Sequence, residues 1–149
     1  MARATRSGPW RQKKDPLWRG DGVDGLQPVD PAADPSLVRH ILYLGGQGRA
    51  TPYHSTSEEY ASAQHFAGTG GRVYETTVAR AQAKGIAHIS RVELLGLLKG
   101  KGQGPAKWSS ALEVMQARKY VEQWSEHILS YVELQDPESA DAAAKDVFD

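Results

Sequence analysis

The feature that most constrains the fold lies in residues 51–60, which read Thr-Pro-Tyr-His-Ser-Thr-Ser-Glu-Glu-Tyr. This pattern predicts a strand that ends at Tyr53, then a polar turn, then a helix over residues 57–67. Ser55 with Glu58, or Thr56 with Glu59, fits a capping box, in which a hydroxyl and a carboxylate satisfy free N–H groups of the first helical turn. In this helix, one face would carry the aromatic and alanine side chains Tyr60, Ala63, Phe66 and Ala67. This segment is either a well-capped helix and nothing more, or a junction whose hydroxyl groups serve a site.

The size and composition of the chain fit one globular domain. A chain of 149 residues buries roughly 70% of its unfolded surface when it folds, so it needs no disulfides for stability. It contains no cysteine, which excludes a disulfide framework, a thiol nucleophile and cysteine zinc sites. No apolar run approaches the length of a membrane span, and the basic N-terminus lacks the apolar segment of a signal peptide. We therefore expect residues 16–149 to form a single domain that is not inserted in a membrane.

Charge is concentrated at the two ends, although the net charge is zero. Residues 1–20 carry six basic side chains against Asp15, and residues 133–149 carry six acidic side chains against Lys145. The simplest interpretation is two solvated tails, with residues 1–15 as a flexible basic lead-in. The alternative is a basic arm that binds an acidic partner such as nucleic acid.

The remaining pattern predicts alternating short helices and strands. Residues 17–19 read as a strand that stops at the turn Gly20-Asp21-Gly22, and residues 22–36 form a proline-rich loop. Further strands are predicted at residues 72–78, 86–89 and 127–134. Residues 37–44 form a short helix or a strand, and helices are predicted at residues 79–84, 90–98, 111–123 and 140–148. Ser90 and Glu93 fit a capping box, and Ser109 or Ser110 is expected to cap the helix of residues 111–123.

The residue types available for chemistry are limited. The histidines show no zinc-binding helical spacing such as H-E-x-x-H, so the sequence gives no sign of a metal site. A G-x-S-x-G elbow is also missing, which argues against a serine hydrolase of the α/β type. Without cysteine, the candidates for chemistry are His, Ser, Glu, Asp and Arg.

Three separated motifs together resemble one enzyme class. They are Leu17-Trp18-Arg19-Gly20, the run Tyr53-His54-Ser55-Thr56-Ser57 before a helix and a strand, and a late glutamate before a strand in Ser125-Glu126-His127-Ile128-Leu129. This order resembles the Arg–Ser–Glu class of mono-ADP-ribosyltransferases, a family that includes many bacterial toxins. The resemblance covers roughly residues 17–134.

The resemblance implies a catalytic set of Arg19, Ser55 and Glu126, with NAD as the substrate. Arginine would bind the pyrophosphate through charge-assisted hydrogen bonds. The serine would orient the nicotinamide ribose and hold the carboxylate, and the glutamate would stabilise the cation that forms when the glycosidic bond breaks. An aromatic ring at or near Tyr53 would stack on the nicotinamide. The expected NAD-binding residues are Arg19, Gly20, Tyr53, His54, Ser55 and Thr56.

Two alternatives to this placement remain open. Glu113 also precedes apolar residues and is a rival for the catalytic position, with Glu122 a weaker one. Members of the class that modify arginine carry Gln or Glu two residues before the catalytic glutamate, where this chain has Trp124. The resemblance therefore leaves the acceptor open, including nucleic acid.

The resemblance implies an α+β fold: a split, mostly antiparallel β core with short flanking helices and a cleft between two sheets. It implies a secreted or delivered toxin or effector that modifies a protein or RNA in the cytoplasm of a target cell, with a cognate immunity protein in the producing cell. No metal is expected. The alternatives are a non-enzymatic α+β module that binds nucleic acid or an acidic protein, and an NAD glycohydrolase that uses no acceptor.

Overall fold

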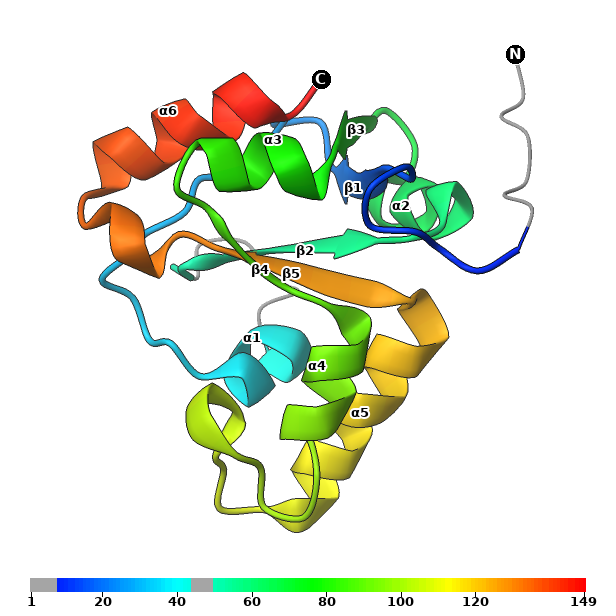
Figure 1. Cartoon of the computed structure of the whole chain (residues 1–149), viewed down its shortest axis with the longest axis vertical. Helices are drawn as coiled ribbons and strands as arrows, with labels where there is room; N and C mark the ends of the chain where they lie inside the picture. Colours follow the sequence, from blue (N-terminus) through cyan, green and yellow to red (C-terminus); the bar gives the residue numbers. More distant parts are fainter. Residues whose placement is uncertain (1–7, 44–49) are drawn as a thin grey trace.

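The computed structural model describes residues 8–43 and 50–149 and has an α+β fold (Figure 1). Five strands form one antiparallel sheet in the order β3-β1-β2-β5-β4. The strands are β1 (Leu17–Asp21), β2 (Tyr53–Ser57), β3 (Arg72–Thr76), β4 (Ala87–Ile89) and β5 (Glu126–Ser130). The helices are α1 (Leu37–Tyr43), α2 (Tyr60–Ala67), α3 (Val78–Ala83), α4 (Arg91–Leu97), α5 (Ala111–Trp124) and α6 (Pro137–Val147), with short 3₁₀ turns at Gly104–Ala106 and Val132–Leu134.

The sheet is nearly divided between β1 and β2. β1 pairs with β3, and β2 with β5, along their whole lengths, but β1 and β2 share the single pair Trp18 with Ser57. The expectation of two separate sheets with a cleft between them is therefore corrected to one sheet. Beyond that one pair the backbones of β1 and β2 no longer form a ladder, and side chains can occupy the gap.

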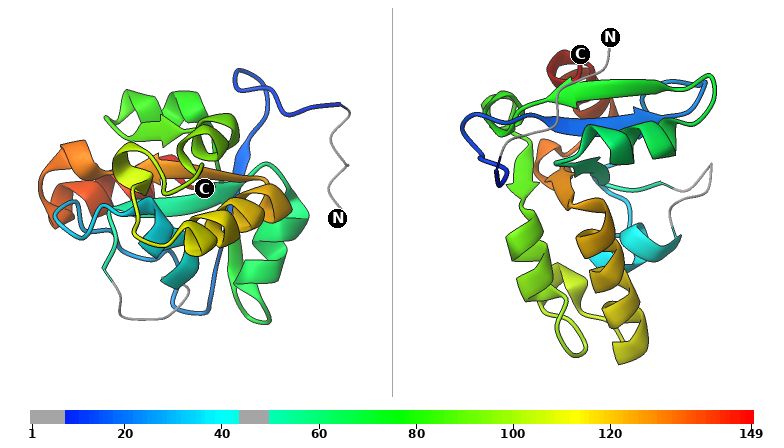
Figure 2. Two further views of the ribbon diagram at one scale, coloured as in Figure 1. Left: turned by 90° about the horizontal axis from the view of Figure 1, so that it is seen from below. Right: turned by 90° about the vertical axis from the view of Figure 1, so that its right-hand side faces the viewer.

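Helices cover both faces of the sheet (Figure 1). On one face, α3 and α6 enclose a core that includes Leu129 of β5. On the other face, α1, α4 and α5 enclose a second core that includes Ile128. Successive side chains of a strand point to opposite faces, so these two adjacent residues anchor β5 in both cores. Figure 2 shows α4 and α5 side by side, extending away from the sheet.

Helix α2 packs unusually closely on β1 because Gly20 has no side chain. A Cβ atom at Gly20 would lie 1.8 Å from the carbonyl oxygen of Ala63. This approach places α2 next to the gap between β1 and β2, which helps to shape the site described below.

Several helix boundaries agree with the sequence. Ser90 and Glu93 form the predicted capping box at the start of α4, and Ser110 accepts a hydrogen bond from the backbone of Glu113 at the start of α5. The predicted strand of residues 127–134 is too long, because β5 spans Glu126–Ser130 and a 3₁₀ turn follows. The strand predicted for residues 17–19 instead continues through Gly20 to Asp21.

The prediction for the 51–60 segment is wrong in its details. Ser55 and Thr56 lie inside β2, and α2 begins at Tyr60 after Glu59, which makes no side-chain cap bond. Neither capping box forms, because Ser55 bonds to Glu126 and Glu58 bonds to His127 and Arg91. Because β2 pairs with β5, the polar side chains that the sequence pattern assigned to a helix cap form hydrogen bonds with residues of β5 instead.

The ends of the chain are not two solvated tails in the described residues. Asp136 caps α6, and Ala140, Ala144 and Val147 of that helix are buried in the core. At the other end, residues 1–7 lie outside the described residues, as does Leu44 of the segment 37–44. The ring centroids of Trp10 and His127 lie 4.4 Å apart, and the indole N–H of Trp10 donates to the carbonyl of Pro16. Part of the expected lead-in is therefore packed against the domain.

Within residues 8–43 and 50–149, no helix is both long and apolar enough to cross a membrane.

Candidate active site

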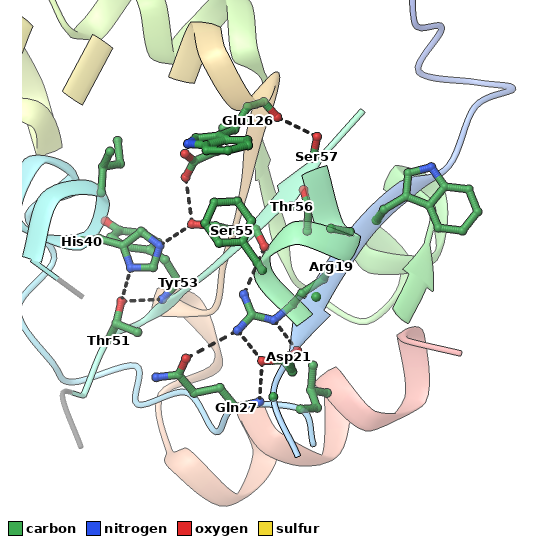
Figure 3. A pocket seen from close by; sticks show the side chains of 18 of the residues that line it. Arg19, Asp21, Gln27, His40, Thr51, Tyr53, Ser55, Thr56, Ser57 and Glu126 are labelled. Atoms are coloured by element: carbon green, nitrogen blue, oxygen red, sulfur yellow. Dashed lines mark hydrogen bonds and ion pairs between the residues drawn. The ribbon is translucent and has the colours of Figure 1, made fainter. Parts of the chain in front are cut away.

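Arg19, Ser55 and Glu126 come from three different strands and line one cavity (Figure 3). The cavity has a volume of about 700 Å³, within the range of roughly 300–1,000 Å³ that is typical of small-molecule sites. It lies where β1 and β2 diverge, and its walls come from β1, the loop 22–28, α1, β2, α2 and the end of α5. Residues that are 36 and 71 positions apart in the sequence are joined there by hydrogen bonds.

The guanidinium of Arg19 is buried and largely committed to protein partners. Its Nε and one Nη2 hydrogen donate to the two carboxylate oxygens of Asp21, each at 2.9 Å. Nη2 also donates to Gln27 at 3.5 Å, and Nη1 donates to the backbone carbonyl of Ser55 at 3.0 Å. A guanidinium has five N–H donors, so one Nη1 hydrogen remains for a ligand. The expectation that the whole arginine fork binds a pyrophosphate is therefore corrected, because Asp21 occupies the fork.

The bond from Arg19 to Ser55 also explains how the gap in the sheet is tolerated. A backbone carbonyl in a strand needs a donor, and leaving it unpaired in the interior is costly. The guanidinium supplies that donor at the point where the β1–β2 ladder stops. Arg19 thus satisfies this backbone carbonyl of the sheet, and it also lines the cavity.

Ser55 is the centre of a line of side-chain hydrogen bonds. Its hydroxyl donates to Oε2 of Glu126 at 2.7 Å, and its Oγ lies 2.7 Å from Nε2 of His40. His40, in turn, has Nδ1 2.8 Å from Oγ1 of Thr51, which also accepts the backbone N–H of Tyr53. Figure 3 shows this line running from Thr51 through His40 and Ser55 to Glu126.

Burial raises the pKa of Glu126 to about 7, against the lowering effects of the hydrogen bond from Ser55 and the positive charge of Arg19. Only 7% of the residue is exposed. The carboxyl group is therefore divided between its two protonation states near neutral pH. Groups with a pKa near the working pH are the ones best suited to take up and release protons in catalysis.

His40 belongs to the site, although the sequence interpretation did not include it. Burial, with a smaller effect from Arg19, lowers the pKa of His40 to about 3, so the ring is neutral. A single histidine in a short helix gives no spacing signal, and its link to Ser55 appears only once α1 is packed beside β2. The sequence also gives no signal for Asp21 and Gln27, because they act by accepting hydrogen bonds from the buried guanidinium of Arg19.

The other predicted NAD contacts divide into two groups. Gly20, Tyr53 and Thr56 line the cavity, but the Tyr53 ring is buried in the core and its hydroxyl donates to the carbonyl of Pro35. His54 is not among the lining residues: as its neighbour Ser55 faces the site, His54 faces the opposite core, where it bonds to Tyr131 and to the carbonyl of Gln27. The alternation of side chains along β2 therefore removes His54 from the cavity.

The rival carboxylates lie elsewhere. Glu113 accepts a hydrogen bond from the indole of Trp108 at 2.9 Å, and Glu122 pairs with Arg118 at 3.4 Å, both outside the cavity lining. Of the three candidates, Glu126 is the one that the structure brings beside Ser55.

An aromatic wall flanks the carboxylate. Trp124, Phe66 and Tyr120 line the cavity, and the rings of Phe66 and Trp124 meet edge to face with centroids 4.9 Å apart. His65 stacks on the indole of Trp124, also at 4.9 Å. Flat apolar surfaces of this kind suit a planar ring in the ligand.

The charged groups of the lining do not favour a highly anionic ligand. Among the described lining residues, Arg19 is the only Lys or Arg, and Asp21, Asp24 and Glu126 are acidic. The described residues also contain no group of three or more His, Cys, Asp or Glu placed to hold a metal ion. Whatever the cavity binds must therefore be held mainly by shape, aromatic contact and a few hydrogen bonds.

Comparison with known proteins found no matching family model, curated protein or solved structure.

Proposed function

We propose that the chain is an NAD-dependent mono-ADP-ribosyltransferase in which the carboxylate of Glu126 stabilises the transition state. The observation that carries this proposal is the meeting of Arg19, Ser55 and Glu126 in one cavity, with Ser55 Oγ 2.7 Å from Glu126 Oε2 and Arg19 Nη1 3.0 Å from Ser55 O. The sequence resemblance named these three residues from separated motifs. Their convergence is what that resemblance requires.

In the proposed reaction, the bond between the nicotinamide nitrogen and C1′ of the ribose breaks, and its electron pair leaves with nicotinamide. Positive charge then develops on the ribose, and a fixed carboxylate beside it stabilises that charge. A nucleophilic atom of the acceptor bonds to C1′, and its proton is released to the solvent. Because the pKa of Glu126 is about 7, its ionised form is available to stabilise the cation near neutral pH.

The other residues have distinct tasks. Ser55 holds the carboxylate in place, and the remaining Nη1 hydrogen of Arg19 is available for a ribose or phosphate oxygen. The ring of Trp124 or Phe66, rather than the buried ring of Tyr53, offers a surface for the nicotinamide. Because the lining is acidic, the pyrophosphate on this proposal lies toward the open side of the cavity, where water screens its charge.

On this proposal the acceptor is a macromolecule, protein or RNA, and the chain acts as a toxin or effector inside a target cell. A cognate immunity protein would then protect the producing cell. The alternative of a non-enzymatic binding module requires the same cavity to bind a ligand without cleaving it.

The test is to incubate the protein with NAD and a cell lysate, measuring nicotinamide release and the transfer of a tagged ADP-ribose. We expect release and labelled acceptor with the wild type, and a loss of about a hundredfold to a thousandfold in kcat for Glu126→Gln. Glu113→Gln is the matched control, since that carboxylate lies outside the cavity, and it should retain activity.

Release of nicotinamide without a labelled acceptor would indicate a glycohydrolase. No release by the wild type, or equal rates for wild type and Glu126→Gln, would contradict the proposal.

A further inference from the structure

His40 of α1 links Thr51 to Ser55 of β2, and neither the sequence motifs nor the proposed reaction explains this link. Its ring lies between Thr51 and Ser55, with Nδ1 2.8 Å from Thr51 Oγ1 and Nε2 2.7 Å from Ser55 Oγ. Both ring nitrogens are thus engaged, and 9% of the residue is exposed. A neutral imidazole has one N–H donor and one acceptor nitrogen, so each tautomer fixes the direction of both bonds.

With Glu126 ionised, only one arrangement satisfies all four residues. The carboxylate can only accept, so the Ser55 hydroxyl donates its single hydrogen to it. Ser55 Oγ must then accept from His40, which places the imidazole hydrogen on Nε2. Nδ1 is left as an acceptor, and Thr51 donates to it. The bonds run from Thr51 to His40, Ser55 and Glu126.

With Glu126 protonated, the same four residues can bond in the opposite direction. The carboxylic O–H donates to Ser55 Oγ, and the Ser55 hydroxyl turns to donate to Nε2 of His40. The imidazole hydrogen then lies on Nδ1 and is donated to Thr51. His40 remains neutral in both arrangements, and what changes is the position of its hydrogen.

We propose that His40 is a positioning residue, which holds the Ser55 hydroxyl on Glu126 when the carboxylate is ionised, and that the hydrogen-bond line Thr51–His40–Ser55–Glu126 reverses when Glu126 takes up a proton. A donor bond from His40 polarises the Ser55 hydroxyl and makes it a better donor, since hydrogen bonds in a chain strengthen one another. The ionised carboxylate gains more from this than the neutral acid. The link to catalysis rests on the proposed function, whereas the reversal of the line does not.

The surroundings favour a neutral His40. The titratable and charged side chains that line the cavity with Glu126 are Arg19, Asp21, Asp24, His40, Tyr53 and Tyr120. The burial of the ring and, to a smaller extent, the positive charge of Arg19 oppose a second proton on His40, whose pKa is lowered to about 3. Above that pH, Glu126 is therefore the group in this line that takes up or releases the proton.

The decisive experiment follows His40 and Glu126 in the free wild-type protein by NMR. Imidazole ¹⁵N shifts distinguish a protonated ring nitrogen from an unprotonated one, and the side-chain ¹³C shift of Glu126 reports its ionisation. We expect the His40 hydrogen on Nε2 above the Glu126 midpoint and on Nδ1 below it. A hydrogen that stays on one nitrogen throughout, or a His40 that becomes doubly protonated with Glu126, would overturn the proposal.

Ser55→Ala provides the control, because it removes the link between His40 and Glu126 without touching either. In that variant the Glu126 titration should no longer change the His40 tautomer. If the tautomer still follows Glu126, the two groups are coupled by another route and the hydrogen-bond line is wrong.

The positioning role is tested by comparing His40→Gln with His40→Asn. The longer amide of Gln can place an N–H donor where Nε2 lies, whereas Asn cannot reach Ser55. We expect His40→Asn to move the Glu126 midpoint to higher pH by about 0.3 to 1 pH unit, the range from a weakened to a lost hydrogen bond, and His40→Gln to move it less. The acidic limb of kcat/KM should shift by the same amount, a loss of about 2- to 10-fold below the midpoint.

Equal midpoints in the two variants would refute the positioning role. The NMR titrations need no NAD, so a failure of the proposed transferase reaction would leave their outcome intact. Conversely, activity that depends on Glu126 without any tautomer change would sustain the proposed function and remove this inference.

Discussion

Replacing Glu126 by glutamine should make the protein more stable at alkaline pH while strongly reducing the proposed transferase activity. The carboxyl group has a pKa of about 7 in the native state, raised chiefly by burial, against a usual value of 4.5. Above pH 7 the folded protein must therefore carry a buried negative charge that the unfolded chain carries in water. Glutamine has nearly the same shape but no ionisation, so the variant avoids that cost.

The size of the effect follows from proton linkage. Between pH 4.5 and 7 the native state binds more protons than the unfolded state, so stability falls as pH rises. Each tenfold difference in proton affinity is worth about 1.4 kcal/mol. The wild type thus loses about 3 kcal/mol of unfolding free energy across this interval on account of Glu126, and Glu126→Gln does not.

The assay is urea unfolding of both proteins at pH 4 and at pH 8. The difference in unfolding free energy between variant and wild type should be about 3 kcal/mol more favourable to the variant at pH 8 than at pH 4. Comparing the two pH values cancels any constant effect of the amide group itself. A difference that does not change with pH, or one that favours the wild type at pH 8, would refute the claim that burial raises the pKa of Glu126.

Further substitutions test the surroundings of the carboxylate. Arg19→Ala should lower the unfolding free energy by about 3–5 kcal/mol, because Asp21 is left buried without its ion-pair partner. Adding Asp21→Ala should recover part of that loss, and equal stability of the single and double variants would contradict the pairing. Ser55→Ala should raise the pKa of Glu126 further, since the hydroxyl lowers it, and move the acidic limb of the pH–rate profile to higher pH. Gly20→Ala should cost at least about 2 kcal/mol in thermal or urea unfolding, since a Cβ atom would lie 1.8 Å from Ala63 O; an unchanged melting temperature would show that α2 does not pack as described.

The sequence predicts most elements of this fold because their signals are local. The capping box at Ser90 and the cap at Ser110 are visible within four residues, and both form. The prediction for residues 51–60 is wrong because a hydroxyl followed by a carboxylate three residues later is equally compatible with a helix cap and with a strand whose side chains bond elsewhere. Pairing of β2 with β5 decides between them, and that pairing joins residues far apart in the chain.

The candidate site could be predicted only in part for the same reason. Arg19, Ser55 and Glu126 stand in recognisable motifs, but nothing local shows that Asp21 takes the arginine fork. The exclusion of His54 follows from the alternation of β2, once the strand is known to extend past Tyr53. His40 carries no motif at all, and its role arises from the packing of α1 beside the site.

The most direct measurement of the central claim is a crystal structure of the Glu126→Gln variant with NAD. This variant should bind NAD without cleaving it, since glutamine keeps the shape of the side chain but not the charge that stabilises the transition state. The account predicts the nicotinamide ribose in the cavity, with C1′ about 3–4 Å from the replaced side chain and the nicotinamide against Trp124 or Phe66. NAD bound elsewhere, or an empty cavity at saturating NAD, would contradict it.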